Sequence, residues 1–154
     1  METISRISTF RDYVGELTAI YKRTSRPTAK IESSLDVDKF IRPYFDTCMD
    51  NHEEMKVIHL NNANKIVNVD HHSSGGTAGT FCDPKLILQK ALLIKTTALI
   101  MVHNHPSGKL DPSTADIETS KRMKEACKII GLRLLDSLII TREGYVSLAD
   151  QALI

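Results

Sequence analysis

Residues 97–116 read Thr-Ala-Leu-Ile-Met-Val-His-Asn-His-Pro-Ser-Gly-Lys-Leu-Asp-Pro-Ser-Thr-Ala-Asp. The stretch opens with an uninterrupted apolar run, which is typical of a central strand covered on both faces. Residues 106–112 follow as a loop rich in Pro, Gly and Asp. Ser113 and Asp116 then stand at the spacing of a helix start. The stretch therefore predicts a buried strand, a turn and a helix, with polar side chains where the strand ends.

Two histidines lie at the end of that strand. His103 and His105 point to the same side of an extended chain, because side chains repeat every two residues. This pair can bind zinc, which takes imidazole nitrogens at about 2.0–2.1 Å. Asp116, in the first turn of the next helix, can give a carboxylate oxygen as the third ligand. Three protein ligands leave a fourth position for water, which is typical of a catalytic zinc site.

Each of these residues also has an ordinary structural explanation. Ser113 and Asp116 come close to a capping box, and a histidine at a strand end is more often only hydrogen bonded. The full pattern His-x-His-x7-Ser-x-x-Asp, however, matches a chain of this composition by chance roughly once in a thousand. The coincidence favours a metal site, in which Ser113 can both cap the helix and face the metal.

Hydrolysis of an amide also needs a base that takes and returns a proton. The strand expected at residues 55–60 is preceded by two adjacent glutamates, Glu53 and Glu54. If that strand pairs beside the strand at 97–102, one glutamate reaches the metal and the other faces away. The sequence pattern alone leaves the choice between them open.

The rest of the chain alternates strands and helices, which predicts a mixed α/β sheet with helices on both sides. Asp83 before Pro84 is expected to cap one helix, Ser34 or Asp36 another, and Gly131 to end a third. The helix at 84–94 is apolar around much of its circumference, so we expect it to be sandwiched. Expected helices span 34–49, 84–94 and 113–130, and expected strands span 55–60, 65–69, 97–102, 132–141 and 145–148.

Two segments are harder to assign. A helical stripe can be drawn through Ile7, Phe10, Val14, Leu17 and Tyr21. The part from Val14 to Tyr21 is also rich enough in β-formers to be a strand, and both assignments stay open. In residues 71–80, three glycines and small polar side chains predict a loop that is not a packed element.

Length and composition predict one domain over residues 1–154, with a poorly defined segment at 1–13. The formal net charge of +1 argues against a strong phosphate-backbone footprint, although local contact with nucleic acid stays open. Three widely spaced cysteines suggest neither a disulfide framework nor a zinc ribbon. We expect no signal peptide, no membrane span and a cytoplasmic location. The oligomeric state is not predicted.

These residues resemble a known signature. A glutamate, His-x-His, seven residues and Ser-x-x-Asp form the JAMM motif of the JAB/MPN metalloproteases. The version here, Val-His-Asn-His-Pro-Ser-Gly followed by Pro-Ser-x-x-Asp, resembles the RadC family, often labelled DNA repair proteins. The resemblance covers roughly residues 14 to 152 and includes Lys30–Ser34, Glu53–Val67, Ser73–Gly76 and Leu134–Asp136.

The resemblance implies a curved mixed β-sheet flanked by helices, similar in architecture to the cytidine deaminases, and it favours a strand at 14–21. It also implies that His103, His105 and Asp116 bind zinc. By the same match, Ser113 would stabilise an oxyanion and Glu53 would be the base.

This sequence departs from longer RadC proteins in two respects. It lacks their helical region that resembles a DNA-binding helix-hairpin-helix, so we expect a short form with a weaker link to DNA repair. Ser137 stands where many relatives carry histidine.

Three functions are weighed against one another. The leading hypothesis is a zinc hydrolase that cleaves an amide or isopeptide bond in a protein or peptide. The alternatives are a DNA-processing nuclease and a non-catalytic module that binds DNA or protein. Lys121 and Arg122 on the helix at 113–130 could suggest a basic face, but Glu118 and Glu125 interrupt it. A deaminase is excluded because the second half of its signature, Pro-Cys-x-x-Cys, is missing.

Overall fold

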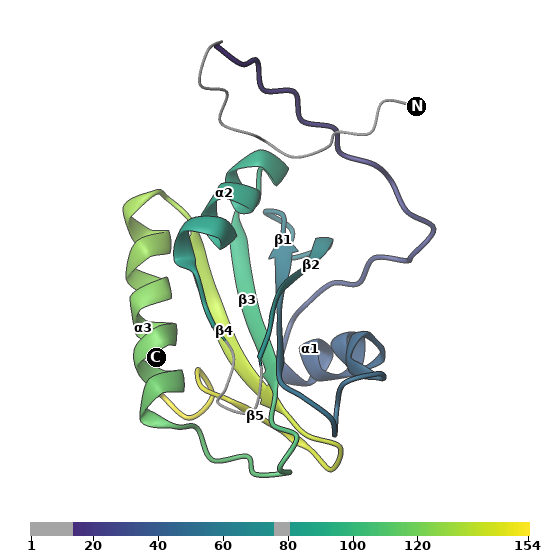
Figure 1. Ribbon diagram of the computed structural model, residues 1–154, viewed down its shortest axis with the longest axis vertical. Coiled ribbons are helices and arrows are strands. Elements are labelled where there is room, and N and C mark those ends of the chain that lie inside the picture. Colours follow the sequence, from purple (N-terminus) through teal and green to yellow (C-terminus); the bar gives the residue numbers. More distant parts are fainter. Residues whose placement is uncertain (1–13, 76–80) are drawn as a thin grey trace.

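The computed structural model describes residues 14–75 and 81–154. Within them a mixed sheet of five strands has the order β2-β1-β3-β4-β5 (Figure 1). β3 lies in the middle, antiparallel to β1 and parallel to β4, which confirms the central position predicted for the apolar run. The strands are β1 (Glu54–Leu60), β2 (Ile66–Ser74), β3 (Ala98–Asn104), β4 (Arg133–Ile140) and β5 (Tyr145–Ser147).

Helices cover both faces of this sheet, as the sequence predicted (Figure 1). One face packs against α1 (Ser34–Ile41) and the short 3-10 helix η1 (Arg42–Phe45). The other face packs against α2 (Pro84–Ile94) and α3 (Thr114–Ile129). Alternate residues of β3 supply the two cores: Ile100 belongs to the α1 side and Met101 to the α2–α3 side. The same alternation places the polar side chains at the end of β3 on opposite faces of the sheet.

The expected β1–β2 hairpin is confirmed, but β2 is longer than predicted. Asn61 Oδ1 accepts hydrogen bonds from the backbone N–H groups of Ala63 and Lys65 and so closes the turn. β2 then continues to Ser74, which pairs with Glu54 of β1. Residues 71–74 are therefore strand and not loop, because backbone pairing outweighs their low hydrophobicity. The glycines at 76 and 79 lie outside the described residues.

α1 differs from the expected helix at both ends. Its cap is Ser33, and neither Ser34 nor Asp36 serves as the N-cap. Asp36 instead completes a capping box, since its carboxylate accepts the Ser33 backbone N–H while Ser33 Oγ accepts that of Asp36. The α-helix ends at Ile41, well short of residue 49. Pro43 accounts for this, because it has no N–H to donate and its ring clashes with an α-helical turn.

Residues 14–24 form neither the strand nor the helix that the sequence allowed. They leave the body of the domain as an irregular segment (Figure 1), and Val14 and Leu17 are exposed. Because Val14 and Leu17 lie in solvent, their β-forming side chains gain nothing from packing. The other proposed members of the stripe, Ile7 and Phe10, lie outside the described residues.

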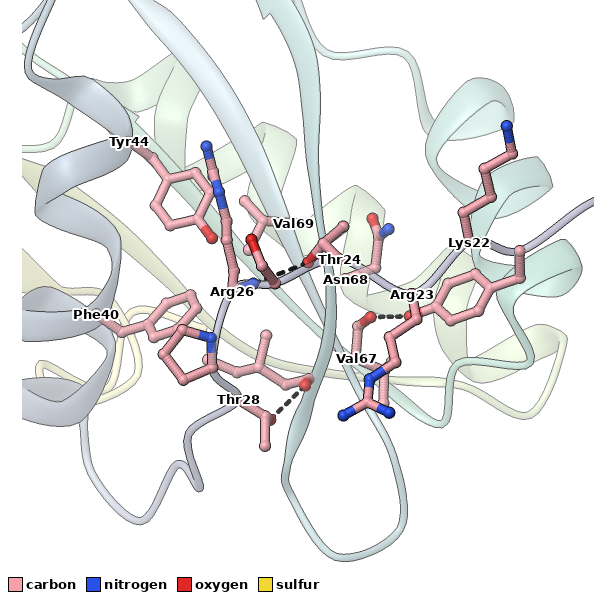
Figure 2. Close-up of a pocket in the computed structure, with 14 residues that line it drawn as sticks. Lys22, Arg23, Thr24, Arg26, Thr28, Phe40, Tyr44, Val67, Asn68 and Val69 are labelled. Carbon is pink, nitrogen blue, oxygen red and sulfur yellow. Dashed lines mark hydrogen bonds between the residues drawn. The ribbon is translucent and has the colours of Figure 1, made fainter.

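Residues 21–28 run beside β2 and, together with it, line a cavity of about 740 Å³ (Figure 2). The Tyr21 hydroxyl donates to the Val67 carbonyl, and the Arg26 guanidinium lies 4.7 Å from the centre of the Tyr44 ring. This cavity adjoins the start of β2, at the other end of the hairpin from Glu54 and Ser74.

α2 is not sandwiched as its composition suggested. Ile87 and Ala91 are buried, whereas Leu86, Leu92 and Leu93 are exposed. Apolar residues on a helix count as core only where another layer meets them, and sequence alone does not show where that layer ends. Among the described residues, no helix is long and apolar enough to cross a membrane.

The two faces of α2 should respond differently to truncation. Ile87→Ala should lower the free energy of unfolding by about 2–5 kcal/mol, because it empties a filled core position. Leu86→Ala, one residue away, should change it by about 0.5 kcal/mol or less. Urea unfolding of both variants measures the difference. Equal losses would mean that another surface covers the exposed leucines in solution.

Candidate metal centre

The end of β3 and the start of α3 bring three predicted residues together. His103 Nε2 lies 3.1 Å from His105 Nε2 and 3.3 Å from Asp116 Oδ1. The third separation, from His105 Nε2 to Asp116 Oδ2, is 3.5 Å. Two ligand atoms held 2.0–2.1 Å from a tetrahedral ion lie about 3.3–3.4 Å apart. The observed separations bracket that value, with each histidine facing a different oxygen of the Asp116 carboxylate, so the three side chains lie close enough together to bind an ion the size of zinc.

A tight turn after β3 sets the orientation of His105. Gly108 has φ +80°, a conformation that favours glycine, and its N–H donates to the His105 carbonyl. The chain then returns so that the Lys109 carbonyl lies 2.8 Å from His105 Nδ1. Because Nδ1 donates its hydrogen there, Nε2 is the nitrogen that faces the cluster, and its lone pair becomes available to a metal ion once Nε2 gives up the proton that it shares with Asp116. The Pro-Ser-Gly turn predicted from sequence therefore also fixes a tautomer.

Ser113 and Asp116 form the capping box that was the structural alternative to a metal site. Asp116 Oδ2 accepts the Ser113 backbone N–H at 2.8 Å, and Ser113 Oγ accepts the Asp116 N–H at 3.0 Å. The same carboxylate faces both histidines. Capping and the metal cluster therefore coexist, since the cap fixes the carboxylate in the direction of His103 and His105.

The charge state of the cluster suits metal binding. Burial alone would raise the pKa of Asp116, but hydrogen bonds from His103 and His105 outweigh it and hold the pKa well below its usual range. The pKa of His105 is raised, chiefly by its hydrogen bond with Asp116 and partly by the charge of Glu53. Asp116 is thus an anion, as a carboxylate ligand must be, whereas the proton favoured on His105 must leave before that residue binds a metal ion.

The strand register separates the two adjacent glutamates. Met55 pairs with His103 in the antiparallel β1–β3 ladder, so the two side chains share one face. Two residues back, Glu53 lies on that face near His105, and its charge contributes to the raised pKa of His105. Glu54 lies on the other face, which is the side of α1. The arrangement brings Glu53, and not Glu54, to the cluster.

Glu54 has partners of its own on the α1 side. Its carboxylate accepts hydrogen bonds from Lys56 Nζ at 2.8 Å and pairs with His52 Nε2 at 3.0 Å. Burial opposes ionisation, but these partners prevail and lower the pKa of Glu54 to about 2. Its interactions are those of a structural carboxylate.

Sequence reasoning missed the residue between the two histidines. Asn104 is completely buried, and its side chain is hydrogen bonded to the segment that leads to Glu53. An amide at the end of a buried strand must find such partners, which is the signal that could have identified it. Of the spare histidines, His71 contacts Lys56 and Ser74, and His72 accepts the Asp83 N–H.

A mixed sheet with this donor set at the end of its central strand defines a JAB-type domain. Residues 31–153 match the family model described as RadC-like JAB domain, and the chain belongs to that family. This confirms the family resemblance and the fold that it implied.

Curated relatives support the same assignment. A "UPF0758 protein" of Flavobacterium johnsoniae is 41% identical over 124 residues, which are 80% of this chain and 53% of the relative. One from Porphyromonas gingivalis is 43% identical over 103 residues, 66% of this chain and 45% of its own length. A third, from Coprothermobacter proteolyticus, is 35% identical over 128 residues, or 82% and 54%. The chain thus spans about half the length of the relatives it matches.

Removing one donor should abolish tight metal binding. Asp116→Asn should weaken zinc affinity by more than about 100-fold, because even a group that only orients a ligand is worth about 10–100-fold. Asp111→Asn makes the same chemical change on the exposed loop and should leave affinity unchanged. Competition with a chromophoric chelator measures both constants. Equal affinities would show that zinc, if bound, is held elsewhere.

Proposed function

We propose that this domain is a zinc-dependent hydrolase that cleaves an amide or isopeptide bond in a protein or peptide. One observation carries the proposal: the two imidazole nitrogens and the Asp116 carboxylate lie 3.1–3.5 Å from one another, with Glu53 on the same face of the sheet. Membership of a JAB-domain family supports it. The proposed ligands are His103 Nε2, His105 Nε2 and one oxygen of Asp116.

In the proposed reaction, Glu53 transfers the proton and Ser113 stabilises the developing negative charge. A bound zinc ion would polarise the scissile carbonyl and lower the pKa of water to about 7. Glu53 takes the proton from the attacking water and returns it to the departing amine nitrogen. The Ser113 hydroxyl donates a hydrogen bond to the oxygen on which negative charge develops.

The position of Ser113 supports its proposed part. Its Oγ accepts a hydrogen bond from the Asp116 N–H, which leaves the hydroxyl hydrogen as a donor. It also precedes the first turn of α3, where unpaired backbone N–H groups favour negative charge. The Ser113 hydroxyl and the start of α3 would therefore both stabilise the negative charge of the oxyanion.

A nuclease built on the same residues is the alternative to a peptidase. Both enzymes would use the proton transfer assigned to Glu53, so a Glu53 variant does not distinguish them. Only assays with the two classes of substrate show which bond is cleaved. Assays with peptide and isopeptide libraries and with phosphodiester substrates, run in parallel on the zinc-loaded chain, separate the two. Cleavage of phosphodiesters alone would replace the peptidase proposal.

Glu53→Gln should lower turnover by about 10²–10⁴-fold, the usual contribution of a positioned base, while zinc stays bound. Glu143→Gln, in the exposed turn before β5, is the matched control and should keep full turnover. Single-turnover rates together with metal content give the measurement. Full activity in the Glu53 variant would remove it from the proposed mechanism.

The two capping boxes of the described chain allow a clean test of Ser113. Ser113→Ala and Ser33→Ala should each cost about 1 kcal/mol of unfolding free energy, because each removes an N-cap. Only Ser113→Ala should also lower turnover, by about 10²–10³-fold, since Ser33 caps a helix on the other face. Similar turnover in both variants would reduce Ser113 to a capping residue.

A further inference from the structure

We propose that Asn104 is a positioning residue, which holds Glu53 in register with His103 and His105. The inference rests on the proposed function, because it assigns Asn104 a part in placing the base. It concerns a side chain that lies on the opposite face of the sheet from the metal cluster. Asn104 therefore acts through the backbone and touches neither the donor atoms nor a substrate.

The Asn104 side chain reaches from β3 to the turn that precedes β1. Its Nδ2 lies 2.9 Å from the His52 carbonyl oxygen, 3.1 Å from that of Met49 and 3.2 Å from that of Cys48. All three carbonyls belong to the irregular segment after η1, which has no strand pairing of its own. One buried amide thus gathers this segment against the central strand.

The same side chain also binds the backbone on the far side of Glu53. Asn104 Oδ1 accepts the Glu54 N–H at 2.8 Å. The His52 carbonyl belongs to the peptide group before Glu53, and the Glu54 N–H belongs to the one after it. Asn104 therefore brackets Glu53 at both of its peptide groups.

A third contact completes the bracket. The Gly75 N–H donates to the Glu53 carbonyl at 2.8 Å, so the peptide group between Glu53 and Glu54 is held from both sides. With both flanking peptide groups fixed, the Cα–Cβ bond of Glu53 has one direction. Because side chains alternate between the two faces along a strand, and Met55 shares a face with His103, that direction points to the face of His103 and His105.

The chemistry of the position calls for asparagine. The side chain must donate to carbonyls and accept from an N–H at the same time, and among short side chains an uncharged amide does both. Aspartate keeps the acceptor but loses the donors. Serine has one donor and is too short to span the gap. The residue is also completely buried, so water does not readily replace its bonds.

A buried amide stabilises the fold whatever else it does, so the test must isolate effects that pass through Glu53. Asn104→Ser and Asn104→Asp are compared with Ser147→Ala, which removes a buried hydrogen bond to Asp136 away from the cluster. Each change is made in the native chain and in the Glu53→Gln chain. All variants are loaded with zinc for turnover and with Co²⁺ for absorption.

We expect the Asn104 variants to keep the metal ion and to lose about 10²-fold in turnover, the cost of misplacing a reacting group by about 1 Å. In the Glu53→Gln chain the same changes should have no further effect, because the group that they misplace is already gone. Ser147→Ala should lower the unfolding midpoint without lowering turnover.

Cobalt absorption against pH provides a readout that needs no substrate. The midpoint is the pH at which half of the change in Co²⁺ absorption has occurred. A nearby carboxylate disfavours ionisation of solvent in the site, so Glu53→Gln should move this midpoint to lower pH. The Asn104 variants should move it in the same direction, and not further when combined with Glu53→Gln. Ser147→Ala should leave it unchanged.

The inference would be overturned if the Asn104 variants lost the metal ion or if both failed to fold. It would also be overturned if they left the pH midpoint of cobalt absorption unchanged, or if they lowered turnover as much in the Glu53→Gln chain as in the native chain. If the native chain cleaves neither amides nor phosphodiesters, the proposed function fails. The cobalt midpoints still decide the role of Asn104 in that case, so the two failures are distinguishable.

Discussion

The antiparallel pairing of β1 with β3 is the constraint on which the rest of the candidate centre depends. Because Met55 lies opposite His103, the segment before β1 delivers Glu53 to the face of the histidines. A slip of one residue would deliver Glu54 instead and would move Lys56 from the α1 side, where it lies over the Phe45 ring, to the α2–α3 side. Apolar residues on both faces of β1 and β3 oppose such a slip, so two packed layers indirectly set the position of a single carboxylate.

The same local motif, a capping box, begins both α1 and α3 but places its carboxylate in different surroundings. A capping box fixes Asp116 at the N-terminus of α3, and another fixes Asp36 at that of α1. The two motifs are locally alike, and only their surroundings differ. Asp116 faces two imidazoles, whereas Asp36 is partly exposed and bonds to neighbouring backbone and to Ser33. The chemistry of such a carboxylate is therefore decided by the strand that the helix start meets.

Local signals in the sequence were enough to predict the central strand, the β1–β2 hairpin, the Asp83 cap and the three-residue cluster, because each depends on near neighbours. The bounds of α1 were wrong for a local reason, because Pro43 ends that helix early. The other failures depend on distant surfaces. Residues 71–74 became strand through pairing with β1, α2 lacked the second layer that its leucines suggested, and residues 14–24 found no partner strand. The choice between Glu53 and Glu54 needed the register, which no local pattern contains.

The tripeptide His103-Asn104-His105 serves both layers of the domain, because its side chains alternate between the faces of the sheet. The histidines face α3, and the amide faces the turn after η1. A residue inserted or deleted within it would move the amide and one imidazole to the wrong layers together. A substitution within this segment therefore affects either the centre or its support, whereas a change in its length would dismantle both at once.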